Sequence, residues 1–135
     1  MKVALPLAFT AALLLSPSAP AQPLTPNCTG SCIVTITMSA GCGSGIKVAP
    51  DPIVVSGDGA DITWQIATTG WAFDSNGIFV HQPADAFSKG SHPQGGGKKF
   101  GWKNVNKGPR AYKYDINLVD GEKHKCKLDP TIVNQ

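Results

Sequence analysis

The segment that most constrains this chain is Ala111–Val119, where apolar and polar side chains alternate. A period of two is the repeat of a β-strand with one buried face. The same alternation recurs in segments 33–38 and 61–66. The side chains predicted to face the core of these three strands are Val34, Ile36, Met38, Ile62, Trp64, Ile66, Tyr112, Tyr114, Ile116 and Leu118.

Turn residues separate these strands from several shorter apolar segments. The chain of 135 residues holds 15 Gly and 11 Pro without a fixed period, and they cluster in segments such as 41–45, 56–59 and 74–77. No window shows the apolar stripe of an amphipathic helix. Seven or eight short strands at this spacing predict an all-β domain, an antiparallel sandwich or barrel.

The N-terminus has the pattern of a secretory signal peptide. Lys2 precedes the uncharged apolar run Val3–Leu15, and Ala19-Pro-Ala21 fits the small-residue rule for cleavage. The run is shorter than the roughly 20 residues that a transmembrane helix needs. We therefore expect residues 1–21 to be removed. Residues 22–135 then form a single exported domain, periplasmic or secreted, without a membrane anchor.

Charge is distributed unevenly along the chain, although the net charge is only +3. Residues 22–88 hold one lysine against five aspartates, a net −4, whereas residues 89–127 hold ten Lys or Arg against three acidic residues, a net +7. The basic segment is a candidate surface for an anionic partner. The alternative is that its lysines keep a small β-protein soluble and protect edge strands. We expect no nucleic-acid partner, because the protein is exported and its alternation places Phe100 and Trp102 in the core.

Four cysteines in an exported chain indicate two disulfides, for which three pairings exist. Cys28 and Cys32 precede the strand at 33–38, and Cys42 follows it. A strand of that length spans about 20 Å, so Cys42 lies at its opposite end. These positions leave the partner of Cys126 open.

The order of several short motifs resembles that of cupredoxin-like domains. Val48-x-Pro50-x-x-Ile53-x-Val55, followed by Ile62-x-Trp64-x-Ile66, resembles the second and third strands of that family. The segment 108–114 resembles the family's strand of alternating aromatics before the metal loop, and Cys126 then stands at the place of the copper-ligating Cys. The resemblance covers residues 46–126 and implies a Greek-key β-sandwich of seven or eight strands.

The copper ligands of the family are incomplete in this chain. A blue-copper site needs two His, one Cys thiolate and usually an axial Met. His81 and Cys126 match two of these ligands, but segment 127–135 has neither His nor Met. The resemblance therefore implies the fold without its copper cofactor. The alternative is a weaker copper or zinc site formed by His81, His124 and Cys126.

The resemblance also implies a disulfide pairing. In the family, the loop after the first strand lies at the same end as the loop that carries the Cys ligand, which places Cys42 near Cys126. We therefore expect the bridges Cys28–Cys32 and Cys42–Cys126, the second at the family's metal end. A bridge from Cys126 to Cys28 or Cys32 is the alternative.

A candidate ligand surface lies in and after segment 68–77, which we predict to be a loop. Trp71 and Phe73 stand beside Asn76, with His81 further on, and such a group suits a sugar or a peptide. Segment 95–98 departs from the phosphate-loop pattern, and Ser44 departs from the nucleophile-elbow pattern. We therefore expect a non-enzymatic binding or structural module. A copper- or zinc-binding protein is the alternative, and a small hydrolase is the third hypothesis.

Overall fold

A computed structural model describes residues 21–39, 42, 45–89 and 93–135 of the chain. The predicted signal peptide therefore lies outside the described residues, apart from Ala21. No helix long and apolar enough to cross a membrane occurs among the described residues. Their strands are β1 (Cys28–Met38), β2 (Ile46–Ala49), β3 (Ile53–Ile66), β4 (Trp71–Val80), β5 (Phe87–Lys89), β6 (Lys99–Asn104), β7 (Arg110–Asp120), β8 (Lys125–Leu128) and β9 (Thr131–Asn134).

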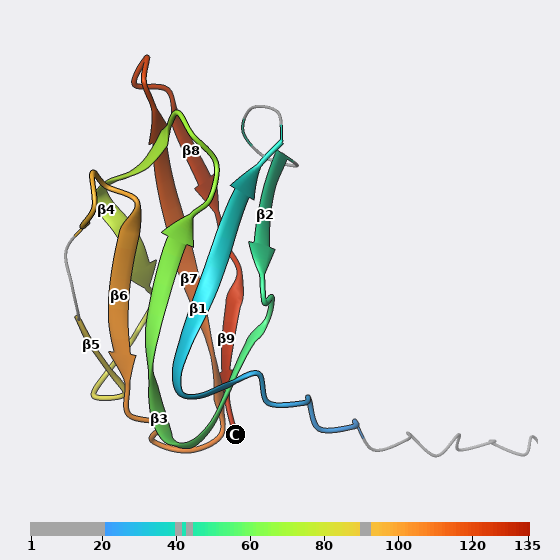
Figure 1. Cartoon of the computed structure of the whole chain (residues 1–135). Helices are drawn as coiled ribbons and strands as arrows, with labels where there is room; N and C mark the ends of the chain where they lie inside the picture. The colour runs from blue at the N-terminus through green and yellow to red at the C-terminus, as the bar shows by residue number, and fades with distance from the viewer. Residues whose placement is uncertain (1–20, 40–41, 43–44, 90–92) are drawn as a thin grey trace, which may run out of the picture.

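The strands form one mixed sheet that folds over into two layers (Figure 1). The hydrogen-bonded order is β2-β1-β3-β9-β7-β4, while β6 joins β3 to β5 and β8 pairs with β7. One layer is built around β3 and the other around β7. The short strand β9 connects them, parallel to β3 and antiparallel to β7. The prediction of an all-β fold is therefore confirmed, in a sandwich-like form.

Aromatic side chains from the two layers meet in the core. The ring centroids of Trp64 and Tyr114 lie 5.3 Å apart, and those of Phe73 and Phe100 lie 5.8 Å apart. All ten side chains predicted to face inward from the three alternating strands are buried. The period-two prediction is thus confirmed on both sides of the core, since β1 and β3 lie in one layer and β7 in the other.

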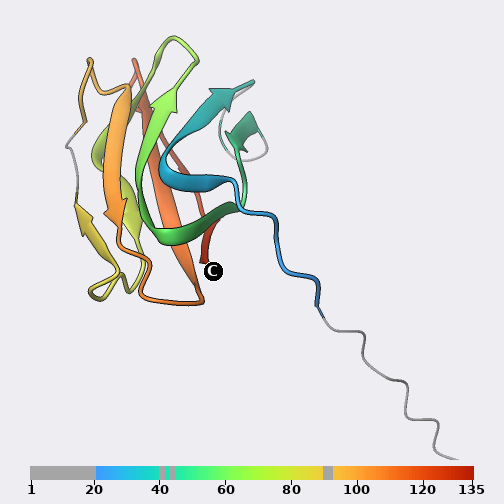
Figure 2. The ribbon, with the colours of Figure 1, turned by 60° about the horizontal axis from the view of Figure 1, so that its bottom comes forward.

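The expectation of a purely antiparallel sheet of seven or eight short strands is wrong in two respects. The described residues contain nine strands, and β3 runs parallel to both β1 and β9. Segment 56–59, predicted to be a turn, lies inside β3. Gly57 and Gly59 adopt positive φ values of 71° and 123°, a region that glycine enters without steric cost. They bend the strand instead of ending it (Figure 2).

Two disulfides hold the fold, with the predicted pairing. Cys28–Cys32 lies within β1, where the register against β3 shifts between Cys28 and Gly30. Cys42–Cys126 joins the segment after β1 to β8, across a sequence separation of 84 residues. The second bridge therefore connects the two layers covalently. Two structural disulfides are typical of proteins that fold in an oxidising compartment.

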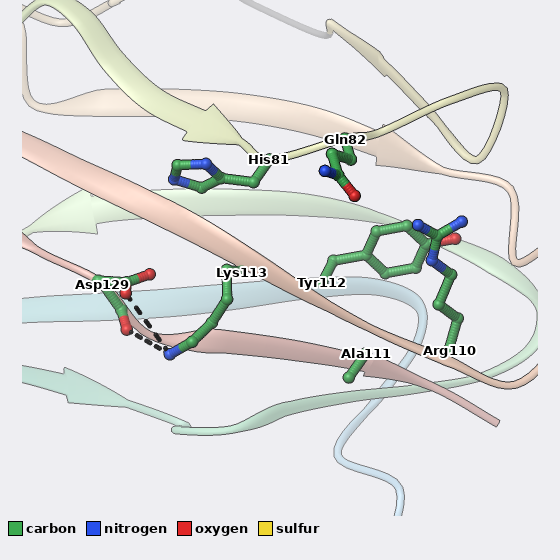
Figure 3. Close-up of a pocket in the computed structure, with 7 residues that line it drawn as sticks. All are labelled: His81, Gln82, Arg110, Ala111, Tyr112, Lys113 and Asp129. Carbon is green, nitrogen blue, oxygen red and sulfur yellow. Dashed lines mark hydrogen bonds and ion pairs between the residues drawn. The ribbon is translucent and has the colours of Figure 1, made fainter.

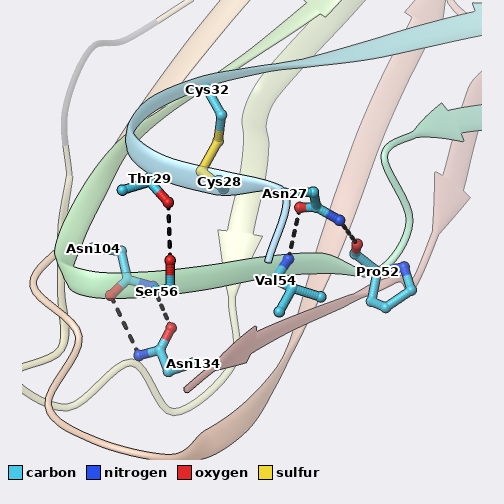
Figure 4. Close-up of a disulfide and its surroundings, with 9 residues drawn as sticks. All are labelled: Asn27, Cys28, Thr29, Cys32, Pro52, Val54, Ser56, Asn104 and Asn134. Carbon is cyan, nitrogen blue, oxygen red and sulfur yellow. Dashed lines mark hydrogen bonds between the residues drawn. A yellow bond between two sulfur atoms is a disulfide. The ribbon is translucent and has the colours of Figure 1, made fainter. Parts of the chain in front are cut away.

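Polar side chains fix the lower end of the fold, near the first disulfide (Figure 4). Asn27 accepts a hydrogen bond from the Val54 amide through Oδ1 and donates one to the Pro52 carbonyl, 2.9 and 3.0 Å long. Asn104 and Asn134 are buried and bond to each other through their side-chain amides. Each buried amide thus has a partner, as burial of polar groups requires.

Each layer presents one outer face to solvent. On the layer of β1, β3 and β6, the outward positions include a threonine on each of β1 and β3, and we call this surface the Thr face. On the layer of β4, β7 and β8, the outward positions surround an exposed phenylalanine, and we call this surface the Phe79 face. The Thr face comprises Ile33, Thr35, Asp61, Thr63, Gln65, Lys99 and Lys103. The Phe79 face comprises Asn76, Phe79, His81, Lys113, Asp115, Asn117, Lys125, Lys127 and Asp129.

Candidate functional site

Phe79 is the residue around which the candidate site is built. It lies in β4 between the buried residues Ile78 and Val80, so the alternation of the strand turns its ring outward. The side chain is 52% exposed. The ring packs against the His81 imidazole in an edge arrangement, with centroids 5.3 Å apart and planes at 84°. The strand and the imidazole together hold an aromatic ring in a fixed position at the surface.

Asp115 lies beside this ring and links two basic side chains. Phe79 and Asp115 are direct partners in the β4–β7 register. His81 Nε2 lies 2.9 Å from Asp115 Oδ1, and Lys127 Nζ lies 2.8 Å from Asp115 Oδ2. Burial opposes ionisation of Asp115, but the hydrogen bonds and charges of His81 and Lys127 outweigh it, so the pKa of Asp115 lies below its ordinary value. The carboxylate is therefore charged at neutral pH and anchored from both sides.

A shallow hollow of about 290 Å³ opens beside the ring, and we call it the Phe79 hollow. Its lining residues are Asn76, Phe79, Asp115, Asn117 and Lys127. Asn117 donates a hydrogen bond from Nδ2 to the Gly77 carbonyl, 3.1 Å long. The Asn76 side-chain amide makes no hydrogen bond to the described residues. The hollow thus combines one apolar ring with two amides, one carboxylate and one ammonium group.

A β-bulge shapes this part of β4. The register of β4 against β7 shifts between Phe73 and Ile78. Asp74 Oδ1 accepts hydrogen bonds from the amides of Asn76 and Gly77, 2.7 and 3.1 Å long. Gly77 has a φ of 48°, and a Cβ at this position would collide with the Phe100 ring. Only glycine fits this position, and the bulge it permits brings Asn76 to the rim of the hollow.

A second hollow of about 390 Å³ lies where β4 ends, next to the first residues of β7. We call it the Arg110 hollow. The Arg110 guanidinium stands 5.1 Å above the centroid of the Tyr112 ring, close to Gln82 (Figure 3). Lys113 turns toward Asp129, with Nζ 2.9 Å from the Asp129 carbonyl oxygen (Figure 3). The remaining lining residues are His81 and Ala111.

The lysines of the Phe79 face are all paired with carboxylates. Besides the contact of Lys127 with Asp115, Lys125 Nζ lies 3.7 Å from Asp74 Oδ2. Lys113 Nζ lies 3.7 Å from Asp129 Oδ2. The face therefore carries little uncompensated charge, although these lysines belong to the basic segment 89–127.

The structure separates the four residues of the predicted ligand surface. Segment 71–77 is not a loop but the first part of β4, so Phe73 is 5% exposed and packs on Phe100 in the core. The assignment of Phe73 to a ligand surface is therefore wrong. Trp71 is half-buried and packs against the core. Asn76 lines the Phe79 hollow and His81 the Arg110 hollow.

Phe79 and Asp115 were missed at the sequence level. The run 78–80 is apolar throughout and does not show which side chain is outermost. The available signal was the strand period itself: extending the alternation of a strand through 78–80 puts Phe79 opposite Ile78 and Val80. Asp115 occupies an outward position of the clearest predicted strand, but it contacts His81, which follows β4, and Lys127 of β8.

The structure does not bring together the ligand set His81, His124 and Cys126. Cys126 is bonded to Cys42 and has no thiolate to offer. His81 follows the last residue of β4, whereas the first residue of β4 pairs with Asp120, next to which His124 is held. A ten-residue strand spans roughly 30 Å, so the two imidazoles lie at opposite ends of the β4–β7 pair.

Two other groups of potential metal ligands occur among the described residues. His81, Asp115 and Asp129 offer donor atoms that all lie within 4.8 Å of one another, and Asp120, Glu122 and His124 do the same at the β7–β8 turn. Desolvation raises the pKa of Asp120, but hydrogen bonds from the His124 side chain and from the amides of His124 and Glu122, together with the charge of His124, outweigh it, so the pKa lies below its ordinary value. All members of the second group are exposed except Asp120, which is half-buried.

No protein family and no curated protein matches this chain. The assignment of a function therefore rests on the geometry of the molecule.

Proposed function

We propose that this protein is an exported, non-enzymatic binding module and that the Phe79 face is its binding surface. The observation that carries the proposal is the Phe79 ring, half-exposed on a strand and surrounded by amide, carboxylate and ammonium groups. Concave sites with an apolar platform and a few convergent polar groups are the usual form of small-ligand sites. The resemblance to cupredoxin-like domains supports a Greek-key sandwich as the scaffold, with the disulfide Cys42–Cys126 at the family's metal end.

A binding role is favoured over a hydrolytic one by the surroundings of His81. A His–Asp pair activates a nucleophile only when a hydroxyl or thiol lies within hydrogen-bond reach of the imidazole. Neither hollow of the face is lined by Ser, Thr or Cys among the described residues. His81 Nε2 is directed at Asp115, and Asp115 is held in turn by Lys127.

Export is supported by the N-terminal pattern of residues 1–21 and by the two disulfides. The experiment is to express the full chain with its N-terminus in a bacterium and to fractionate the cells. We expect the mature protein, beginning at or near Gln22, outside the cytoplasm with no free thiol. Full-length protein retained in the cytoplasm would contradict the proposal.

The binding proposal is tested by a screen of immobilised oligosaccharides and peptides with the wild type and two variants. Phe79→Ala removes the ring from the proposed surface. Ile33→Ala is the matched control, because Ile33 is 59% exposed on the Thr face and its loss also removes an exposed apolar side chain. We expect ligands retained by the wild type and by Ile33→Ala to be lost with Phe79→Ala. Equal retention by all three proteins would contradict the proposal.

A copper- or zinc-binding role is the second candidate, and the group His81, Asp115 and Asp129 favours it. One imidazole and two carboxylates suit zinc, with an open position for water. Lys127 and Lys113 already pair with the two carboxylates, so a metal would compete with them. Calorimetric titration with Zn²⁺ and Cu²⁺ tests it, with His81→Ala against His124→Ala as control. Heat that disappears only in His81→Ala supports this role.

A further inference from the structure

We propose that the Phe79 hollow binds an uncharged pyranose ring, stacked on Phe79, as one residue of a neutral glycan. This inference rests on the proposed function and names the ligand class of the same surface. The notable property of the site is that a flat apolar ring and a rim of hydrogen-bonding groups occur together without net charge.

The ring is suited to stacking because it is already held in place. Ile78 and Val80 are buried on either side of Phe79, and the His81 imidazole packs against it. A rigid aromatic side chain has few torsions to lose on binding and therefore presents contact area at low entropic cost. The C–H groups on one side of a pyranose form the complementary apolar surface.

The rim supplies partners for hydroxyl groups, which both donate and accept. Asn76 has a side-chain amide without a partner among the described residues. Asn117 donates to Gly77, which leaves its side-chain carbonyl oxygen available as an acceptor. Asp115 and Lys127 add an anchored carboxylate and an ammonium group at the same hollow. These four groups lie beside one aromatic ring, where they can bond to the hydroxyls of one pyranose.

The charges favour a neutral ligand over an acidic one. Lys127, Lys125 and Lys113 each face a carboxylate, those of Asp115, Asp74 and Asp129 respectively. An acidic sugar would have to displace one of these carboxylates from its lysine, and a basic ligand would have to displace the lysine. A neutral sugar leaves every pair intact.

The size of the site fits a single sugar ring. Clefts for drug-sized ligands occupy about 300–1,000 Å³, and the Phe79 hollow, at about 290 Å³, lies just below that range. A hexose has about 12 non-hydrogen atoms, so ordinary ligand efficiency gives a Kd on the order of 1 mM for one ring. Tighter binding of a longer glycan would come from further contacts along the face.

The test is saturation-transfer NMR and a Kd titration with methyl glucopyranoside, methyl galactopyranoside, methyl mannopyranoside and methyl glucuronide. We expect at least one of the three neutral glycosides to bind at a millimolar Kd. Truncation of a central aromatic contact typically weakens binding roughly tenfold or more, and we expect this for Phe79→Ala. Ile33→Ala should bind like the wild type, and the matched glucuronide should bind no better than the glucoside.

A second variant separates stacking from simple loss of apolar volume. Phe79→Leu keeps an apolar side chain on the strand and removes the aromatic face, so it should lose the glycoside as Phe79→Ala does. Unchanged circular dichroism and the absence of free thiols establish that both variants fold.

Three outcomes overturn the inference. The first is that no neutral glycoside binds below about 10 mM while the earlier screen still finds a peptide that depends on Phe79; the proposed function then survives. The second is that the glucuronide binds better than the glucoside and that salt weakens it. The third is that Phe79→Leu retains full affinity. If no ligand of either screen depends on Phe79, the proposed function fails as well.

Discussion

The Thr face and the Phe79 face arise from the same strand alternation, but they differ in whether their lysines form ion pairs. On the Thr face, Lys99 and Lys103 make no ion pair within the described part of the chain, and the uncharged residues Thr35 of β1 and Thr63 and Gln65 of β3 lie beside them. On the Phe79 face, every lysine of β7 and β8 lies within 4 Å of a carboxylate from another strand or from the segment between β8 and β9. The sum of charges along the chain therefore does not indicate where free charge lies.

The lysines of the basic segment 89–127 therefore have two different roles, which the sequence alone does not distinguish. Unpaired lysines at the surface keep a β-protein soluble and attract anionic partners. Paired lysines instead fix the position of the carboxylates around a site. We therefore expect an anionic partner of the protein to approach the Thr face and an uncharged ligand to approach the Phe79 face.

The largest expected effect comes from cutting the covalent link between the layers that carry the two faces. The chain-entropy relation gives about 4–5 kcal/mol for a bridge with a separation of 84 residues and about 2 kcal/mol for one with a separation of four. Cys42→Ser with Cys126→Ser should therefore lower the free energy of unfolding more than Cys28→Ser with Cys32→Ser. Urea denaturation measures both. An equal loss would show that the bridge between the layers stabilises the fold no more than the local bridge does.

The next effect concerns the carboxylate at the centre of the Phe79 face. Asp115→Asn leaves His81 and Lys127 without their ionic partner, and loss of a partner for polar groups that are partly buried costs about 1–2 kcal/mol. Asp61→Asn is the matched control on the Thr face, where Asp61 is exposed and has no ion pair with the described residues; we expect a change within about 0.5 kcal/mol. Thermal denaturation distinguishes them, and similar shifts in Tm would remove the contrast between the faces.

The same carboxylate makes stability depend on pH. The pKa of Asp115 is lower in the folded protein than its ordinary value of about 3.9. Its contribution is therefore fully present above about pH 5 and is lost as the pH falls through the ordinary value toward the lower folded one. Urea unfolding from pH 6 to pH 2 should show a shallower loss for Asp115→Asn than for the wild type. Asp120 contributes in the same direction, so some slope should remain. If the wild type and Asp115→Asn lost stability in parallel as the pH falls, the lowered pKa of Asp115 would be contradicted.

The smallest effect on stability is expected from the unpaired lysines. Lys99→Gln with Lys103→Gln should change the free energy of unfolding by no more than about 0.5 kcal/mol. The double variant should nevertheless elute earlier from a sulfated column, because these charges are free. Lys113→Gln with Lys125→Gln removes the same net charge from paired positions and should elute closer to the wild type. The reverse order of elution would place the free charge on the Phe79 face.

The sequence predicted the buried positions correctly wherever the alternation within one strand decides which side chains face the core. The alternation in 111–119 identified the core positions of β7, and the four cysteines, with the family resemblance, identified both bridges. The length of β3 was not predicted, because Gly57 and Gly59 are typical turn residues. Here they bend a strand that its partners β1 and β9 hold on both sides of the bend. Local composition contains no information about those partners.

The candidate site was predicted only in part for a related reason. Asn76 and His81 were identified because polar residues near aromatics suggest a ligand. Phe73 was placed at the surface because the turn residues of 74–77 suggested a loop, whereas a bulge at Gly77 keeps the strand continuous. Asp115 depends on His81 and Lys127, which lie 34 residues before it and 12 residues after it in the chain. A contact that joins three separate segments of the chain can be predicted only once the order of the strands in the sheet is known.

The position of β9 has a consequence for when the molecule can assemble. This strand, Thr131–Asn134, is formed from almost the last residues of the sequence, and yet it lies between β3 and β7 in the middle of the sheet. Because β9 follows all the other described strands in the sequence, the hydrogen bonds through which it joins β3 to β7 form only after both of those strands have been synthesised. Contacts between such distant segments form slowly.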